Sequence, residues 1–316
     1  MNLDDLRNEY SRLMDVSTIK DCIEALEIYE RFYLTIISSH HSQINNSIQE
    51  KQAKLVLQMM LTKNLHLKTL LSGVDLKTEL GQVLKNIIDP TIIASFIRNI
   101  YETVCMFNII YQCNKNDART IVYNLWVHSG LKYRQRFETN ITTQENRQKL
   151  ANEKKEIETL INEIENTELY KNLDAKNQKK IQTQIKEKAY LIRFQNYDVE
   201  ILNWQSSSSV MGVKTGFFDN MYTYFSLYSH PSNVAVFQFG EMFSKNEDEY
   251  INLTAFHLRN FFLLSSIFIA DYLNLFPQTL KSFETLPVLD QIVINTNNIL
   301  TRGYDYSIND TWKKLG

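Results

Sequence analysis

The scarcity of glycine and proline is the feature that most constrains the fold of this chain. Among 316 residues there are 8 Gly and 4 Pro. Folds built from many short strands need turn residues at frequent intervals, whereas long helices exclude both residue types. Hydrophobic residues make up 44% of the chain, which is enough for a buried core. The sequence therefore predicts an all-α protein, a multi-helix bundle.

Apolar residues recur at helical spacing along most of the chain. We expect helices at 18–45, from Ser47 to about Gly73, a shorter one from Asp75, and at 90–112, 117–138, 217–229, 249–276 and 279–300. Asp89-Pro90 is typical of a helix start, with an N-cap aspartate and proline at the first helical position. Residues 204–216 are expected to form a loop, and 233–239 a short strand or an extended segment.

The composition changes at about residue 139, and from there to about 200 the chain is rich in Lys, Glu, Gln and Asn. A narrow apolar stripe runs through this segment and is interrupted by NLDAKNQ (172–178). This pattern predicts an inserted antiparallel helical hairpin at 139–200, protruding from the body. Residues 1–138 and 201–316 would then form one helical core domain. The other interpretation is a single flexible charged insertion.

Charge and cysteine content exclude several classes of protein. A net charge of −2 gives no global attraction to nucleic acid or to an anionic membrane. The three cysteines form no C-x-x-C motif, which argues against a zinc site or disulfide framework and fits a reducing cytosol. The N-terminus is acidic and polar, which is not typical of a signal peptide. The apolar stretch 261–276 is too short to span a bilayer. We expect a cytoplasmic protein with no membrane contact, cofactor or metal.

The segment YFSLYSHPSN (224–233) contains the first candidate functional residue, His230, directly before a proline. A residue before proline avoids helical geometry, so the preceding helix should end there, with the ring at its C-terminus. Ser229 and Ser232 could hydrogen-bond the ring or cap the last carbonyl groups. The other interpretation is a helix-ending turn without chemistry.

Arg98 and Glu102 are the second candidate pair, one turn apart on a helix that is apolar nearly all round. A buried charge without a partner is costly, and Arg before Glu is the weaker order for a helical ion pair. Each is therefore expected to have a partner from elsewhere in the chain. An ordinary salt bridge within the helix is the alternative.

A third candidate is a basic patch at Lys132, Arg134 and Arg136, joined by lysines of the charged segment. These side chains could contact the phosphates of RNA, or they could form a solvated face.

Several of these motifs resemble a broad bacterial family of unknown function. The resemblance covers about 90–245, and its motifs here are Arg98-x-x-x-Glu102, Trp204, Lys214-Thr-Gly216 and Ser226-x-x-x-His230-Pro-Ser232. It implies an all-helical fold, distantly similar to the HEPN class, which includes abortive-infection and toxin ribonucleases. The Arg-x(4–6)-His motif of HEPN nucleases is absent, because the nearest pair, Arg119 and His128, falls on opposite helix faces.

Two hypotheses follow, and the sequence does not decide whether the protein is an enzyme. In the first it is a HEPN-like stress or phage-defence effector with a metal-independent ribonuclease site. Its catalytic residues would be Arg98, Glu102 and His230: Arg98 would hold a phosphate, His230 would transfer a proton, and Glu102 would orient the ring or balance Arg98. Ser226, Ser229 and Ser232 would support them. In the second it is a non-catalytic interaction or scaffold module. The same residues would form a structural polar network, and 139–200 would bind a partner protein or a second copy.

Overall fold

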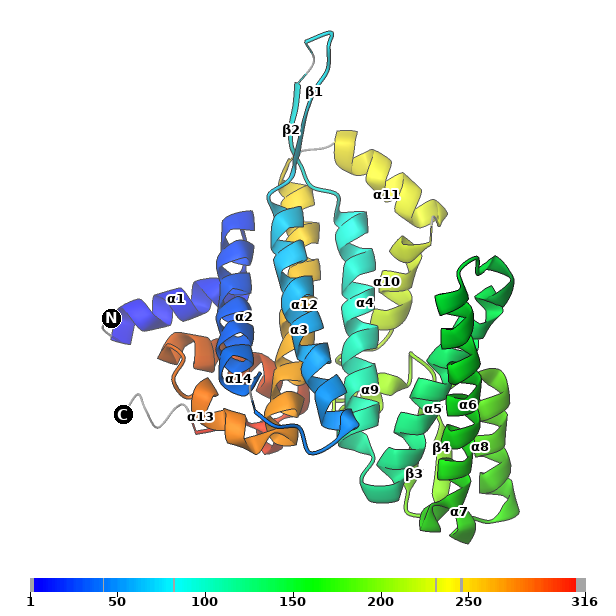
Figure 1. The fold of residues 1–316 in the computed structure, drawn as a ribbon. Coiled ribbons are helices and arrows are strands. Elements are labelled where there is room, and N and C mark those ends of the chain that lie inside the picture. Colours follow the sequence, from blue (N-terminus) through cyan, green and yellow to red (C-terminus); the bar gives the residue numbers. More distant parts are fainter. Residues whose placement is uncertain (1–2, 42, 82, 231, 245–246, 311–316) are drawn as a thin grey trace. The chain divides into compact units, whose positions relative to one another are not determined.

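The computed structural model describes residues 3–41, 43–81, 83–230, 232–244 and 247–310 (Figure 1). The described residues are essentially all helical, with two short antiparallel strand pairs, which confirms the all-α prediction. The chain divides into two compact units. Unit 1 consists of 1–105 and 212–316, and unit 2 of 106–211.

Unit 1 is a helical bundle with a β-hairpin. Its elements are α1 (Leu3–Asp15), α2 (Ile19–His40), α3 (Ile48–Leu71), β1 (Val74–Lys77), β2 (Val83–Ile87), most of α4 (Pro90–Asn108), α10 (Met221–Ser229), α11 (Asn233–Ser244), α12 (Glu247–Leu275), α13 (Leu280–Phe283) and α14 (Val288–Arg302). Helix α2 packs against α3, and α12 packs against both α2 and α14. Aromatic side chains fill this core, where Tyr29 stacks on Phe262 with ring centroids 5.3 Å apart.

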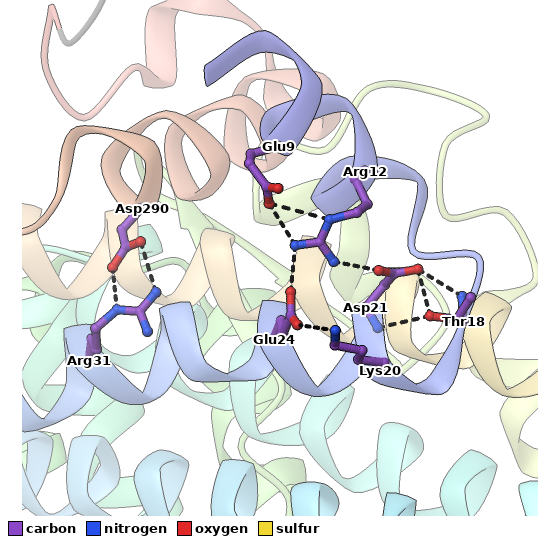
Figure 2. A network of polar contacts seen from close by, with 8 residues as sticks. All are labelled: Glu9, Arg12, Thr18, Lys20, Asp21, Glu24, Arg31 and Asp290. Carbon is purple, nitrogen blue, oxygen red and sulfur yellow. Dashed lines mark hydrogen bonds and ion pairs between the residues drawn. The ribbon is translucent and has the colours of Figure 1, made fainter. Parts of the chain in front are cut away.

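Ion pairs connect α1 and α14 to α2, as Figure 2 shows. Arg12 of α1 binds Glu9 at 2.6 Å and also contacts Asp21 and Glu24 of α2. Arg31 of α2 binds the buried carboxylate of Asp290 on α14, with Nε and Oδ2 2.7 Å apart.

Helix α12 contains the segment Ile251–Leu275, which is long and apolar enough to cross a membrane by length and composition. In the described part of the chain it is the one such helix, and 67% of its most apolar window is buried within the protein. The helix is longer than the apolar stretch 261–276 that seemed too short to span a bilayer, and the core helices of globular proteins pass the same test.

Unit 2 is built around α5. Its elements are a π-helical turn (Ile109–Cys113), α5 (Asn116–Arg134), a 3-10 turn (Gln135–Asn140), α6 (Gln144–Asn166), α7 (Glu168–Asn172), α8 (Ala175–Glu187), β3 (Ile192–Gln195), β4 (Asp198–Ile201) and α9 (Ser207–Val210). Helix α5 packs against both α6 and α8. Strands β3 and β4 pair antiparallel, with Ile192 opposite Ile201.

The charged segment 139–200 contains three helices, where a simple hairpin has two. Helix α6 has 23 residues and α8 has 13, and the short α7 lies between them. The breaks arise because the side chains of Thr167 and Asp174 accept N-cap hydrogen bonds that start new helices. The apolar stripe of α6 is buried at Leu150, Ile157, Leu160 and Ile164. The stripe belongs to the packing of α6 and α8 on α5.

Two local predictions are wrong. The helix expected from Asp75 is the β1–β2 hairpin, in which the Asp75 carboxylate accepts a hydrogen bond from the Asn86 backbone at 2.8 Å. Gly73 precedes it with φ +71°, and a Cβ there would lie 2.7 Å from the Asn86 backbone. Residues 233–239 belong to a helix, α11, because the hydroxyl of Ser232 caps it by accepting from the Ala235 N–H.

Candidate functional site

Helix α4 positions the first half of the site. It begins as predicted, with the Asp89 carboxylate accepting from the Thr91 N–H at 2.8 Å and Pro90 at the first helical position. Most of its surface is buried, including Ile97 and Tyr101. Arg98 and Glu102 lie on the partly exposed remainder, with side chains 20% and 29% exposed.

Helix α10 positions the second half, and it ends at Ser229 as the proline signal predicts. His230 is extended, with φ −112° and ψ 140°, and its N–H donates to the carbonyl of Ser226. The helix begins at Met221, later than expected, because Asn220 has a left-handed backbone with φ +60°.

The hydroxyls of the three serines around His230 form hydrogen bonds with backbone groups. Ser226 and Ser229 donate to carbonyl groups one turn earlier, at 2.6 and 3.1 Å. Ser232 donates to the Leu227 carbonyl at 2.8 Å and caps α11. Their described contacts therefore shape the turn that presents His230.

The guanidinium of Arg98 joins α4 to α10 and brings the predicted residues together. Its Nε donates to Glu102 Oε1 at 3.1 Å, and its Nη1 lies 3.2 Å from His230 Nε2. Its Nη2 donates to the Tyr222 hydroxyl at 2.8 Å, and its carbon lies 4.9 Å from the centre of the Tyr222 ring. Arg98, Glu102, Tyr222 and His230 are called the Arg98 cluster below.

A hydrogen bond between Arg98 and His230 requires one tautomer of the imidazole ring. A guanidinium has only donors, so the Nε2 atom that faces Arg98 must be an acceptor. An imidazole with an unprotonated Nε2 is neutral and carries its proton on Nδ1. In this arrangement the basic lone pair of an exposed histidine is held by a cation.

Lys63 of α3 lies beside the cluster and was missed from the sequence. Its ammonium group donates to Thr103 Oγ1 at 2.9 Å and to Asn99 Oδ1. Burial lowers the pKa of this amine to about 8, although the charge of Glu102 opposes the shift. Buried Met60 and Leu67 flank it at helical spacing, which is the signal that it borders the apolar face of α3.

Tyr222 was also missed as a site residue, since it reads as one of the apolar residues of its helix. The signal is its spacing, because Tyr222, Ser226 and His230 recur at i, i+4 and i+8 and share one side of the segment.

The basic patch predicted at Lys132, Arg134 and Arg136 lies in unit 2. Arg134 donates to the buried carboxylate of Glu153, with its Nε 3.0 Å from Oε2. Arg136 lies over the Tyr133 ring at 4.7 Å. Phosphate binding by this patch stays a prediction.

Within the part of the chain that the structure describes, no group of three His, Cys, Asp or Glu side chains could hold a metal ion. No curated protein and no solved structure is significantly similar to the chain. Residues 86–250 match the model of DUF5677, a family of unknown function. Because this match covers more than half of the chain and includes Arg98, Glu102 and His230, the protein belongs to the DUF5677 family.

Proposed function

We propose that the protein is a ribonuclease of the HEPN-like defence type and that the Arg98 cluster is its active site. The observation that carries the proposal is the contact between the Arg98 guanidinium and the Nε2 lone pair of exposed His230. A fixed cation next to an accessible neutral imidazole is the pair that phosphodiester cleavage needs, because one group binds the anion and the other accepts a proton.

Arg98 has capacity for a phosphate. A guanidinium has five N–H donors, and the contacts to Glu102, Tyr222 and His230 use three of them. Phosphate oxygens would take the others and compete for the donor that faces His230. Phosphate binding would thereby release the Nε2 lone pair at the moment when substrate arrives.

The reaction would then proceed on the ribose adjacent to the bound phosphate. Nε2 of His230 accepts the proton of the 2′-hydroxyl, and the 2′-oxygen forms a bond to phosphorus. The bond from phosphorus to the 5′-oxygen breaks, and that oxygen keeps the electron pair of the bond and takes a proton from water. The hydroxide left behind takes the proton from His230, which restores the neutral base. The products are a 2′,3′-cyclic phosphate and a 5′-hydroxyl end, and Arg98 stabilises the charge that develops on phosphorus-bound oxygens.

Glu102 and Tyr222 would position the guanidinium. Glu102 holds Nε and Tyr222 holds Nη2, so the plane of the group is fixed at both ends. This pre-organisation is what electrostatic stabilisation of a transition state requires.

The test is cleavage of an end-labelled RNA by the purified full chain, with analysis of the product ends. We expect cyclic phosphate ends from the wild type and a loss of roughly 100-fold or more in His230→Ala. His41→Ala is the matched control, because His41 is an exposed histidine at the end of α2. Intact RNA after incubation with wild type would contradict the proposal.

One observation favours a second candidate, a structural role for the cluster. Nε, Nη1 and Nη2 of Arg98 all have protein partners, so the group links α4 to α10 without any ligand. On this view the protein is an interaction module, and His230→Ala lowers the melting temperature while wild-type expression leaves cellular RNA intact.

A further inference from the structure

We propose that Lys63 is a second phosphate-binding group of this site and that the substrate binds through two neighbouring phosphates of a single strand. The inference rests on the proposed ribonuclease function and deepens it. It extends the site from α4 and α10 to α3.

The contacts of Lys63 place it next to the Arg98 cluster. Its two acceptors, Asn99 and Thr103, each follow a cluster residue by one position on α4. One residue is about 100° of turn on a helix, so Lys63 contacts the neighbouring stripe of the same helix surface. Asn99 is exposed, which leaves this stripe open to solvent.

No described carboxylate lies within ion-pair distance of the Lys63 ammonium, although the charge of Glu102 acts on it from farther away. Both hydrogen-bond acceptors of this ammonium are neutral. An ammonium has three donors, and these two contacts leave a third for a ligand. A partly buried cation held by neutral groups costs free energy in the absence of an anion, and a bound phosphate would offset that cost.

Two cations on adjacent stripes suit two phosphates better than one. Arg98 extends from α4 toward α10, whereas Lys63 extends from α3 toward α4. The negative charge of Glu102 acts on both cations. A strand that crosses α4 would place one phosphate at Arg98 and the next at Lys63. Mononucleotides and inorganic phosphate could satisfy only one of these positions.

Amine labelling of the full chain tests the placement of Lys63 directly. The protein is treated with acetic anhydride alone, with a short single-stranded 2′-O-methyl RNA, which lacks the attacking hydroxyl, or with inorganic phosphate. Lys281, an exposed lysine of α13, is the internal control. We expect RNA to reduce acetylation of Lys63 several-fold, inorganic phosphate to leave it unchanged, and Lys281 to react equally in all samples.

The salt dependence of RNA binding tests the energetic role. Each phosphate contact on a single strand contributes about 0.7 to the slope of log affinity against log salt. Lys63→Met should lower the magnitude of that slope by about this amount, and Lys281→Met should not.

The outcomes separate this inference from the proposed function. If RNA binding depends on Arg98 while Lys63 keeps its labelling and Lys63→Met keeps the wild-type slope, the inference fails and the ribonuclease proposal stands. Equal protection of Lys63 by inorganic phosphate would overturn the two-phosphate assignment. If wild type neither binds nor cleaves RNA, both proposals fall together.

Discussion

Arg98 and His230 are 132 positions apart in the sequence, and their side chains meet with Nη1 and Nε2 3.2 Å apart. The contact places a permanent cation beside an imidazole nitrogen. It also makes Arg98 responsible for the position of three other polar side chains, so its removal has effects that can be measured without a substrate.

Arg98→Met should lower the free energy of unfolding by about 1–3 kcal/mol, because Glu102, Tyr222 and His230 each lose a charged hydrogen-bond partner. Urea denaturation followed by circular dichroism measures this change. Arg7→Met is the matched control, since Arg7 is largely exposed and its ion pair with Asp4 should contribute roughly 0–1 kcal/mol. Equal effects of the two substitutions would show that the cluster adds no stability.

Acid should destabilise the protein through His257 and His40. Burial lowers the pKa of His257 to about 3, and burial, with the charge of Lys54, lowers that of His40 to about 4. The unfolded chain binds a proton at each histidine below about pH 6.5, and the folded protein does not. Their stabilisation is therefore complete above pH 6.5 and is lost as the pH falls toward 4 and 3.

At pH 4.5 each of these two histidines should cost about 2 kcal/mol relative to pH 7. Denaturation curves at several pH values measure the loss. His257→Phe should reduce the slope of stability against pH by about one proton between pH 6 and 4.5. An unchanged slope in this variant would mean that His257 titrates alike in the folded and unfolded states.

Arg12 should hold α1 against α2. Its guanidinium contacts the carboxylates of Glu9, Asp21 and Glu24, whereas α1 itself buries only Leu13 among its described side chains (Figure 2). Arg12→Met should therefore speed amide hydrogen exchange in α1 at least several-fold and leave the core helices unchanged.

The control for Arg12 is Lys20→Met, which removes a more exposed partner of the same Glu24 carboxylate at 3.7 Å. Burial raises the pKa of Asp21, but hydrogen bonds from Thr18 and Arg12 outweigh it and lower the pKa overall. This contribution is present above the unfolded-state pKa of Asp and is lost as the pH falls through the lower folded-state value. If Lys20→Met sped amide hydrogen exchange in α1 as much as Arg12→Met does, the attachment of α1 to α2 would not depend on Arg12.

The hydroxyl of Tyr29 should contribute to the free energy of unfolding, although the ring lies in an apolar core. It contacts Ser266 Oγ at 2.9 Å, the Phe262 carbonyl at 3.1 Å and Asn297 Nδ2 at 3.0 Å. Tyr29→Phe removes these three buried contacts and should cost about 1–3 kcal/mol in a denaturation experiment. Tyr304→Phe removes an exposed hydroxyl and should have no measurable effect.

The meeting of Arg98, Glu102 and His230 could be predicted because each residue is locally anomalous. Two charges on an apolar helix need partners, and a histidine before proline must leave its helix. Lys63 could not be found this way, since its acceptors belong to another helix and only packing shows them. The HEPN relationship and the ribonuclease activity stay predictions.

The wrong local assignments have physical causes as well. The alternation in VAVFQF is typical of a strand, yet the Ser232 cap and the helical geometry of 233–244 prevail. The hairpin after Gly73 depends on the contact between the Asp75 side chain and the Asn86 backbone, which links residues eleven positions apart. Propensity within a short window contains no information about such contacts.

The order of the two halves of the Arg98 cluster matters during synthesis. Unit 2 lies between them in the sequence, so the ribosome makes the guanidinium long before the imidazole. A nascent chain, or one released early by a premature stop codon before residue 230, holds Arg98 without His230. Under the proposed activity, translation of this protein could not expose its own messenger to a working nuclease until most of the polypeptide had been made.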